Sequence, residues 1–235
     1  MSQPDFYNKA FYNTQKDMSY KSASTVLPYV LKHFPEIKRV TDIGCGLGTW
    51  LAVAKSMNCQ ILGRDSHNQE GDLYIDRSEF VRTDLACCDV PELQEKPFDL
   101  AISLEVAEHI PEESANNFIR FICSQSDLVL FSAAIPLQGG VNHINEQWQS
   151  YWRTIFEQNN YLCFDSIRNQ FWTNEDVEFW YAQNSFLYVN REKKNLCEQA
   201  ATLHTPMPMD VRHPKAITKR IKKTLRQKIR KLVGF

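Results

Sequence analysis

The sequence predicts an α/β protein with a doubly wound, mostly parallel sheet of seven strands and helices on both faces. Short apolar runs of strand length alternate with segments of helical periodicity along most of the chain. A glycine-rich turn at 44–48 follows the first of these runs directly. The chain has 235 residues, 43% of them hydrophobic, which suits one such domain with a short appendage.

Strand and helix signals follow one another in order. Strands are predicted at 38–44, 59–65, 79–85, 98–106, 127–135, 161–167 and 184–191, and helices at 49–57, 111–125 and 146–159. An amino-terminal helix is predicted from the apolar spacing between Ala23 and Phe34, with Pro28 expected to start or kink it. Because crossovers between parallel strands are right-handed, ligands are expected beyond the carboxyl ends of the strands.

The turn TDIGCGLGTW carries three of the chain's eight glycines, Gly44, Gly46 and Gly48. Glycine adopts positive φ and allows close approach, and the helix that follows offers unpaired N–H groups. The dinucleotide fingerprint G-x-G-x-x-G is not met, because Thr49 stands where the third glycine belongs. A phosphate-binding P-loop is also excluded, since no Lys-Ser/Thr pair follows. The turn therefore predicts a different nucleoside ligand.

Two carboxylates end the next predicted strands. Asp65 lies 21 positions after Gly44, where a carboxylate can accept hydrogen bonds from ribose hydroxyls. Asp84 ends the third strand and can accept an adenine amino proton, with Leu85 packing on the ring; a turn cap is the alternative explanation for Asp84.

These motifs in order, VTDIGCGLGTWL, Asp65 after QILG, RTDL and FDLAISLEVAEHI, resemble those of class I S-adenosylmethionine (SAM) methyltransferases over about residues 38–135. The resemblance implies a Rossmann-like fold and SAM as cofactor. It implies that SAM is held by Asp42 and the backbone of Gly44, Cys45, Gly46 and Gly48 (methionine part), Asp65 (ribose), Asp84 and Leu85 (adenine), and Leu104 and Glu105 (sulfonium side). The segments 11–28 and 135–152 look like a bacterial subgroup often encoded near glycan and natural-product genes.

Methyl transfer to a hydroxyl needs a base, and histidine is the usual choice. His109 follows the fourth predicted strand, and His143 follows the fifth with Glu146 nearby as its orienter or as an alternative base. Helix capping is the plainer explanation of this segment, with Asn145 as N-cap and Glu146 in the first turn. No metal site is expected, and the Asn-Pro-Pro-aromatic motif of amino-group methyltransferases is missing. The sequence therefore favours O-methylation of a sugar, glycan precursor or natural product.

Charge is distributed unevenly. Ten of the 27 Lys and Arg residues lie in 211–235, which contains no Asp or Glu. Residues 215–235 have an apolar residue about every fourth position, which predicts a basic amphipathic helix. Contact with an anionic membrane surface is favoured for this tail, with docking onto protein, a solvated tail and nucleic acid as alternatives. The tail lacks the aromatic residues of a single-strand binder, which argues against nucleic acid.

Four segments are expected: a helical segment 1–36 covering the cofactor site, a SAM-binding domain 37–190, a linker 191–216 and the basic tail 217–235. The aromatic, acidic stretch 171–184 is a candidate lid.

Seven cysteines without a CxxC pair predict free thiols. With no signal-peptide pattern, a cytoplasmic protein is expected, peripheral to the inner face of the membrane. A non-catalytic SAM-binding scaffold tethered to a membrane complex and an RNA methyltransferase remain alternative functions.

Overall fold

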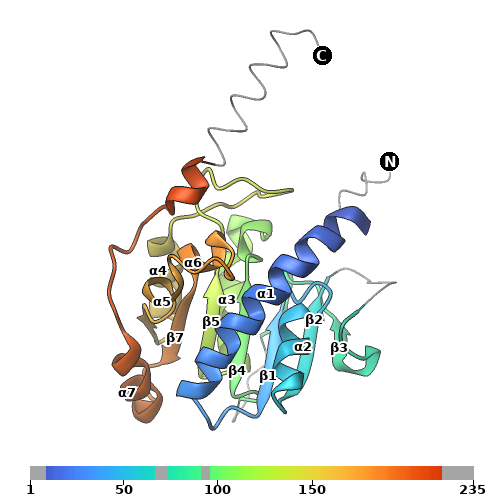
Figure 1. Ribbon diagram of the computed structural model, residues 1–235. Coiled ribbons are helices and arrows are strands. Elements are labelled where there is room, and N and C mark those ends of the chain that lie inside the picture. Colours follow the sequence, from blue (N-terminus) through green and yellow to red (C-terminus); the bar gives the residue numbers. More distant parts are fainter. Residues whose placement is uncertain (1–8, 67–72, 91–95, 219–235) are drawn as a thin grey trace, which may run out of the picture.

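A computed structural model describes residues 9–66, 73–90 and 96–218. Seven strands form one sheet in the order β3-β2-β1-β4-β5-β7-β6 (Figure 1). The strands are β1 (Arg39–Ile43), β2 (Gln60–Asp65), β3 (Phe80–Arg82), β4 (Leu100–Leu104), β5 (Leu128–Ser132), β6 (Tyr161–Phe164) and β7 (Phe186–Asn190). The first five are parallel, and β7 pairs antiparallel with β5 and β6. The prediction of a doubly wound, mostly parallel sheet of seven strands is confirmed.

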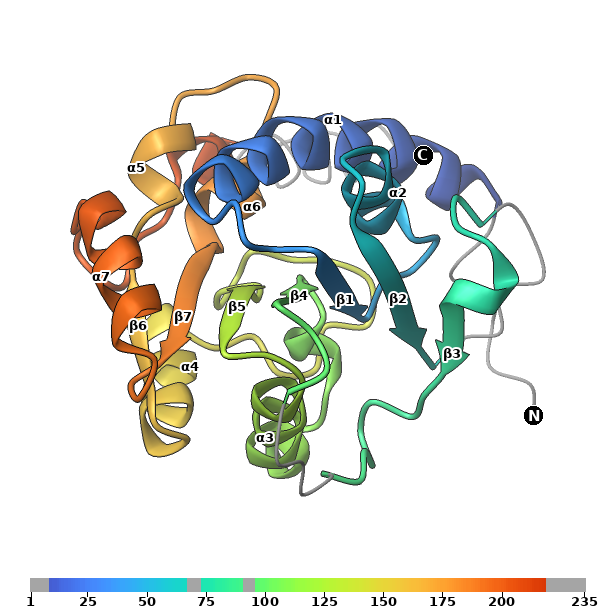
Figure 2. The ribbon, with the colours of Figure 1, turned by 90° about the horizontal axis from the view of Figure 1, so that it is seen from below.

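Helices cover both faces of this sheet, as Figure 2 shows: α1, α2, α5 and α6 on one face, α3 and α4 on the other. Their bounds are α1 (Lys9–His33), α2 (Thr49–Ser56), α3 (Ala115–Gln125), α4 (Gln149–Gln158), α5 (Arg168–Phe171), α6 (Phe179–Asn184) and α7 (Lys194–Leu203). Three short 3-10 turns lie at Arg77–Glu79, Ala107–His109 and Glu112–Ser114.

The alternation of side chains along the central strands creates two separate cores. On β4, Leu100 and Ile102 belong to the core beneath α1 and α2, whereas Ala101 belongs to the core beneath α3 and α4. All five residues of β4 and of β5 are buried, as expected for strands covered on both faces. Phe156 of α4 stacks on Tyr188 of β7 with ring centroids 3.8 Å apart, so the antiparallel strand is fixed to the same core.

The amino-terminal helix differs from its prediction. α1 begins at Lys9, well before the predicted apolar stretch, and it runs through Pro28 without ending there. Ala23, Val26 and Val30 lie in the core on both sides of the proline. Tertiary packing of this apolar stripe therefore outweighs the loss of one backbone hydrogen bond.

The expected capping of the helix after β5 is wrong. α4 begins at Gln149 with Trp148 as its N-cap, so neither Asn145 nor Glu146 belongs to the helix start. Asn145 is buried instead, and its backbone N–H donates to the carbonyl of Glu108 at 3.0 Å. Trp148 itself is 38% exposed. Several strands are also shorter than predicted, β4 ending at Leu104 because Glu105 adopts φ +57°.

The segment 191–216, which was predicted to be a linker, is partly helical. It contains α7, and its later part is anchored to the body by the buried side chain of Arg168. The guanidinium donates to the carbonyls of Met209 (2.8 Å) and Pro208 (3.1 Å) while pairing with the buried carboxylate of Asp165. The buried Arg168–Asp165 ion pair, whose guanidinium also donates to two carbonyls, therefore holds this segment against the body. The apolar pattern of the sequence does not predict this contact.

The remaining expectations concern 171–184 and the tail. The candidate lid is packed: its residues Val177, Tyr181 and Ala182 belong to the core beneath α1. Residues 214–218 are helical, and the rest of the predicted tail helix lies outside the described residues.

All seven cysteines have free thiols, as predicted. Within 9–66, 73–90 and 96–218, no helix has the length and apolar character to cross a membrane.

Replacing Arg168 by methionine is expected to lower the free energy of unfolding by about 3–5 kcal/mol, because Asp165 would keep an uncompensated buried charge. Urea denaturation measures this loss, and limited proteolysis should show cleavage within 205–213. Arg153→Met is the matched control, since Arg153 pairs with Glu157 at the surface and its loss should cost less than about 1 kcal/mol. Equal stability losses in the two variants would contradict the anchoring role.

Candidate active site

The glycine turn lies between the end of β1 and the start of α2. Gly44, Gly46 and Gly48 have φ of +87°, +53° and +81°, a region that other L-residues rarely adopt. A Cβ on Gly44 would lie 2.3 Å from a methyl of Val106, so this glycine lets the end of β4 approach the turn. At Gly46 no atom lies within 4 Å of where a Cβ would be. The turn thus presents bare backbone on the side that Gly46 faces.

Asp65 lies directly against this turn. It ends β2, is 9% exposed, and accepts a hydrogen bond from the backbone N–H of Gly46 at 2.9 Å. The contact follows from the parallel pairing of β1 with β2, which puts both carboxyl ends at the same edge of the sheet. A carboxylate has about four acceptor positions, so the bond to Gly46 leaves capacity for ligand hydroxyls.

Asp42 adds a second acid beneath the turn. Its side chain is 4% exposed, and burial raises the pKa of the carboxyl to about 8, with the charge of Asp65 adding to the shift. Two carboxylates in one poorly solvated place are costly when both are ionised. A cationic ligand over the turn would offset that cost.

Asp84, Leu85 and Cys45 occupy different environments. Asp84 is exposed and accepts a hydrogen bond from the N–H of Ala86 at 3.0 Å, the local turn contact that was the alternative explanation. Leu85 is buried in the core beneath α3. Cys45 is buried, and burial raises the pKa of its thiol far above the usual range, so it is an inert side chain supporting the turn.

Glu105 follows β4 and Leu104, and it carries a polar network that sequence reasoning missed. Its carboxylate accepts hydrogen bonds from Gln138 (2.6 Å), Ser132 (2.9 Å) and Asn184 (3.1 Å). Burial raises the pKa of Glu105 to about 7, and the three donors partly offset this shift. Asn184 ends α6, directly before β7 begins. Because β7 runs antiparallel to β5, its start lies at the edge of the sheet where β4 and β5 end, and this places Asn184 beside Glu105. No local sequence signal could have shown this contact.

His143 and Glu146 form a dyad in the loop after β5. Nδ1 of His143 lies 2.9 Å from Oε1 of Glu146. The same carboxylate accepts from the backbone N–H groups of Leu137 (2.7 Å) and Gly139 (2.9 Å), so it is fixed by the loop itself. Because a carboxylate only accepts, Nδ1 carries the proton of the neutral ring and Nε2 carries the lone pair. The expected pairing of these two residues is present.

His109 and Glu108 complete this cluster. The rings of His109 and His143 meet edge to face with centroids 4.9 Å apart, and Nδ1 of His109 lies 3.1 Å from the carbonyl of Asn142. Glu108 is 1% exposed, and one of its oxygens lies 3.8 Å from Nε2 of His143. Ligand-type atoms of Glu108, His109 and His143 all lie within 4.8 Å of one another. No metal site was expected from the sequence, because His109 and His143 lie far apart in the chain and only the fold brings them together.

Neither carboxyl oxygen of Glu108 has a hydrogen-bond partner within the part of the chain that the structure describes. Burial, followed by the charge of Glu105, raises the pKa of Glu108 well above its usual value. The N–H groups of Glu108 itself and of Ala134 oppose this shift without reaching hydrogen-bond geometry. Buried carboxyl groups without partners are rare and costly.

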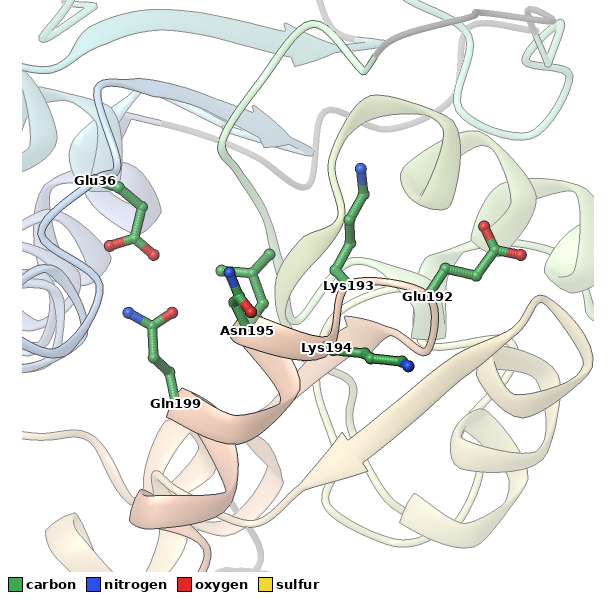
Figure 3. Close-up of a pocket in the computed structure, with 7 residues that line it drawn as sticks. Glu36, Glu192, Lys193, Lys194, Asn195 and Gln199 are labelled. Carbon is green, nitrogen blue, oxygen red and sulfur yellow. The ribbon is translucent and has the colours of Figure 1, made fainter.

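Hollows on the surface include two whose positions can be compared with that of the glycine turn. One of about 610 Å³ adjoins the start of α7, and Figure 3 shows that its labelled side chains point in different directions, Lys193 and Lys194 among them. It lies at the edge opposite the glycine turn, because β7 runs antiparallel to the strands that carry the turn. The other, of about 570 Å³, is lined by Tyr20, Lys21, Ser24 and Tyr74. It adjoins the glycine turn, since the N–H of Tyr74 donates to the carbonyl of Leu47.

Comparisons with known proteins agree with this geometry. A family model described as "Methyltransferase domain" matches residues 14–186. No curated protein sequence matches the chain significantly. Solved structures with a similar fold include three methyltransferases.

The SAM-bound amino pentose methyltransferase CalS10 from Micromonospora echinaspora has a TM-score of 0.55 and 9% identity, over 80% of this chain and all of that one (100%). A SAM-dependent methyltransferase from Archaeoglobus fulgidus has a TM-score of 0.52 and 15% identity, over 77% and 99%. Magnesium protoporphyrin IX methyltransferase (ChlM) from Synechocystis PCC 6803 with bound SAH has a TM-score of 0.50 and 20% identity, over 81% and 90%.

The family model covers most of the chain, and the sheet order and glycine turn are in place. The chain therefore belongs to the class I SAM-dependent methyltransferases, with SAM as its cofactor.

The raised pKa of Asp42 predicts a pH-dependent stability. Between the unfolded value of 3.8 and the folded value of about 8, the folded protein holds a proton that the unfolded chain has released. Stability must therefore fall as pH rises through this window, by at most about 1.4 kcal/mol per pH unit from this one group. Urea denaturation between pH 5.5 and 7.5 should show this decline for the wild type relative to Asp42→Asn. Parallel pH profiles of the two proteins would rule out the shift.

Proposed function

We propose that this methyltransferase transfers the methyl group of SAM to a hydroxyl of a sugar, glycan precursor or other natural product. The observation that carries the proposal is the His143–Glu146 dyad, which lies beyond the carboxyl end of β5 in the same sheet that presents the glycine turn. Ligands of doubly wound sheets bind at this edge. CalS10 is an amino pentose methyltransferase and ChlM is a magnesium protoporphyrin IX methyltransferase, so small acceptors are compatible with the fold.

The donor end of the site is proposed as follows. The backbone of 44–48, with Asp42 beneath it, holds the methionine part, and Asp65 accepts the ribose hydroxyls. Asp84 and Leu85 border the adenine, and Leu104 and Glu105 border the sulfonium side. The bare face at Gly46 and the paired acids fit a bulky cationic nucleoside. When bound, SAM supplies an electrophilic methyl group, and its positive charge offsets the cost of ionising Asp42.

α1 is proposed to cover this donor site, as expected for segment 1–36. Tyr20 and Tyr74 lie with ring centroids 6.4 Å apart across the hollow beside the glycine turn. Tyr181 of α6 contacts Trp50 of α2 edge to face and lies 3.2 Å from the hydroxyl of Ser19. These contacts tie α1 to the elements that form the site, and they would limit the access of water during transfer.

At the acceptor end, His143 can act as a base. Nε2 of His143 accepts the proton of the acceptor hydroxyl, and Glu146 stabilises the imidazolium that forms. His109 packs on the ring of His143 and orients it. A scaffold that only binds SAM has no need of such a dyad, so catalysis is favoured over the scaffold. For the basic tail 215–235, the sequence pattern supports a peripheral contact with an anionic membrane surface.

Asp65→Ala and Gly46→Arg are expected to weaken SAM binding at least tenfold, the first by removing the ribose acceptor and the second by filling the bare face. Isothermal titration calorimetry measures both. Glu157→Ala, an exposed change on α4, serves as the control and should bind SAM like the wild type. Unchanged SAM affinity in both site variants would refute the donor assignment.

His143→Ala is expected to slow methyl transfer by about 10²–10⁴-fold while leaving the affinity for SAM unchanged, because a general base contributes on this scale. The measurement is transfer of labelled methyl from SAM into fractions of a metabolite and glycan extract. His33→Gln, a histidine change at the end of α1, is the matched control and should retain full transfer. If His143→Ala turns over normally, the acceptor is activated by another group.

A further inference from the structure

We propose that Glu108, His109 and His143 bind one divalent first-row transition-metal cation of the Zn²⁺ or Co²⁺ type. Binding itself rests on this cluster alone, whereas its consequence for catalysis rests on the proposed function.

The first argument is the state of Glu108. Its side chain is 1% exposed, both oxygens lack hydrogen-bond partners among the described residues, and one oxygen faces the ring of His143. Burying an unpaired carboxylate costs several kcal/mol, and a neutral carboxyl would still leave a polar group unsatisfied. Glu105 adds a second acid close by. A divalent cation bound to Glu108 removes this cost directly.

The second argument is distance. Oε1 of Glu108 and Nε2 of His143 are 3.8 Å apart, which is too long for a hydrogen bond. Two atoms that each lie about 2.1 Å from one cation are separated by roughly 3–4.2 Å, so this gap fits a pair of ligands. A ring nitrogen of His109 lies within 4.8 Å of the ligand atoms of Glu108 and His143. Rotation of the side chains about their χ angles would bring the three ligand atoms onto one cation.

The third argument is the support behind the rings. Metal-binding histidines usually donate their second N–H to a carboxylate or a carbonyl, which fixes the ring and raises its basicity. Nδ1 of His143 has Glu146 at 2.9 Å, and Nδ1 of His109 has the carbonyl of Asn142 at 3.1 Å. Glu146 is held in turn by two backbone N–H groups of the loop. This arrangement directs the lone pair of Nε2 of His143 toward Glu108.

The space for the ring is also provided. A Cβ on Gly140 would lie 1.9 Å from Nε2 of His143, so only glycine at this position allows the ring its present place. Two imidazoles and one carboxylate suit Zn²⁺, Co²⁺ or Mn²⁺ better than Mg²⁺ or Ca²⁺, which prefer all-oxygen sites. Three protein ligands leave a further coordination position for a substrate oxygen.

A bound cation changes the chemistry of the acceptor. With Nε2 of His143 on the metal, the ring has no lone pair left for a proton, and the acceptor oxygen takes the open position instead. Coordination lowers the pKa of the hydroxyl, whose proton passes to water. The oxygen then forms the bond to the methyl carbon as the carbon–sulfur bond breaks. His143 is thus the base of the metal-free cluster and a ligand of the loaded one.

The test uses the full chain, stripped with EDTA and exchanged into chelator-free buffer. Zn²⁺ binding is followed by calorimetry and Co²⁺ binding by its visible absorption, and SAM affinity is measured on the same samples as a check of folding. Glu108→Gln, which keeps the shape of the side chain, and His143→Gln are the site variants. His33→Gln is the matched histidine control.

The wild type and His33→Gln should each bind one equivalent of cation, and the Co²⁺ spectrum should lack thiolate charge-transfer bands. Both site variants should bind at least tenfold more weakly while keeping their affinity for SAM. The inference is overturned if the wild type takes up no stoichiometric cation, or if Glu108→Gln binds it as tightly as the wild type. Because SAM binding is read separately, failure of the metal site leaves the methyltransferase assignment standing, and loss of SAM binding by the wild type refutes that assignment instead.

Discussion

The parallel pairing of β1 between β2 and β4 is the constraint on which the whole site depends. In this register the ends of all three strands meet at one edge, so the glycine turn, Asp65 and Glu105 are brought together from distant parts of the chain. The positive φ of the glycines and the absence of a side chain at Gly44 allow Val106 to close against the turn. The hydrogen bond from Gly46 to Asp65 then fixes the carboxylate at the bare face. Without this register none of these groups would share a surface.

Buried acids dominate this edge, and they give it its chemical character. Burial raises the pKa of Asp42 to about 8 and of Glu105 to about 7, and Glu108 has no hydrogen-bond partner in the described segments. Such an arrangement costs stability in the unliganded protein, and a cationic nucleoside on one side of β4 and a metal cation on the other would recover it. Binding and folding are therefore coupled at this site: the groups that weaken the empty fold are those that would select positively charged ligands.

Local and long-range features differed in how far the sequence could predict them. The sheet, the glycine turn, Asp65 and the His143–Glu146 pair could be predicted because each depends on short spacings or on strand ends. The start of α4, the anchoring of 205–213 by Arg168 and the donors Gln138 and Asn184 around Glu105 could not, because each is set by contacts between segments far apart in the chain. Glu108 is adjacent to His109 in the sequence, but its lack of hydrogen-bond partners among the described residues results from burial, which linear spacing does not show.

A crystal structure of the full chain grown with S-adenosylhomocysteine tests the central claim most directly. The ribose hydroxyls are expected within hydrogen-bond distance of the Asp65 carboxylate, and the amino acid part is expected over the backbone of 44–48. A ligand bound at another edge of the sheet, or a pyrophosphate-containing compound retained in this crevice from the expression host, would contradict the account.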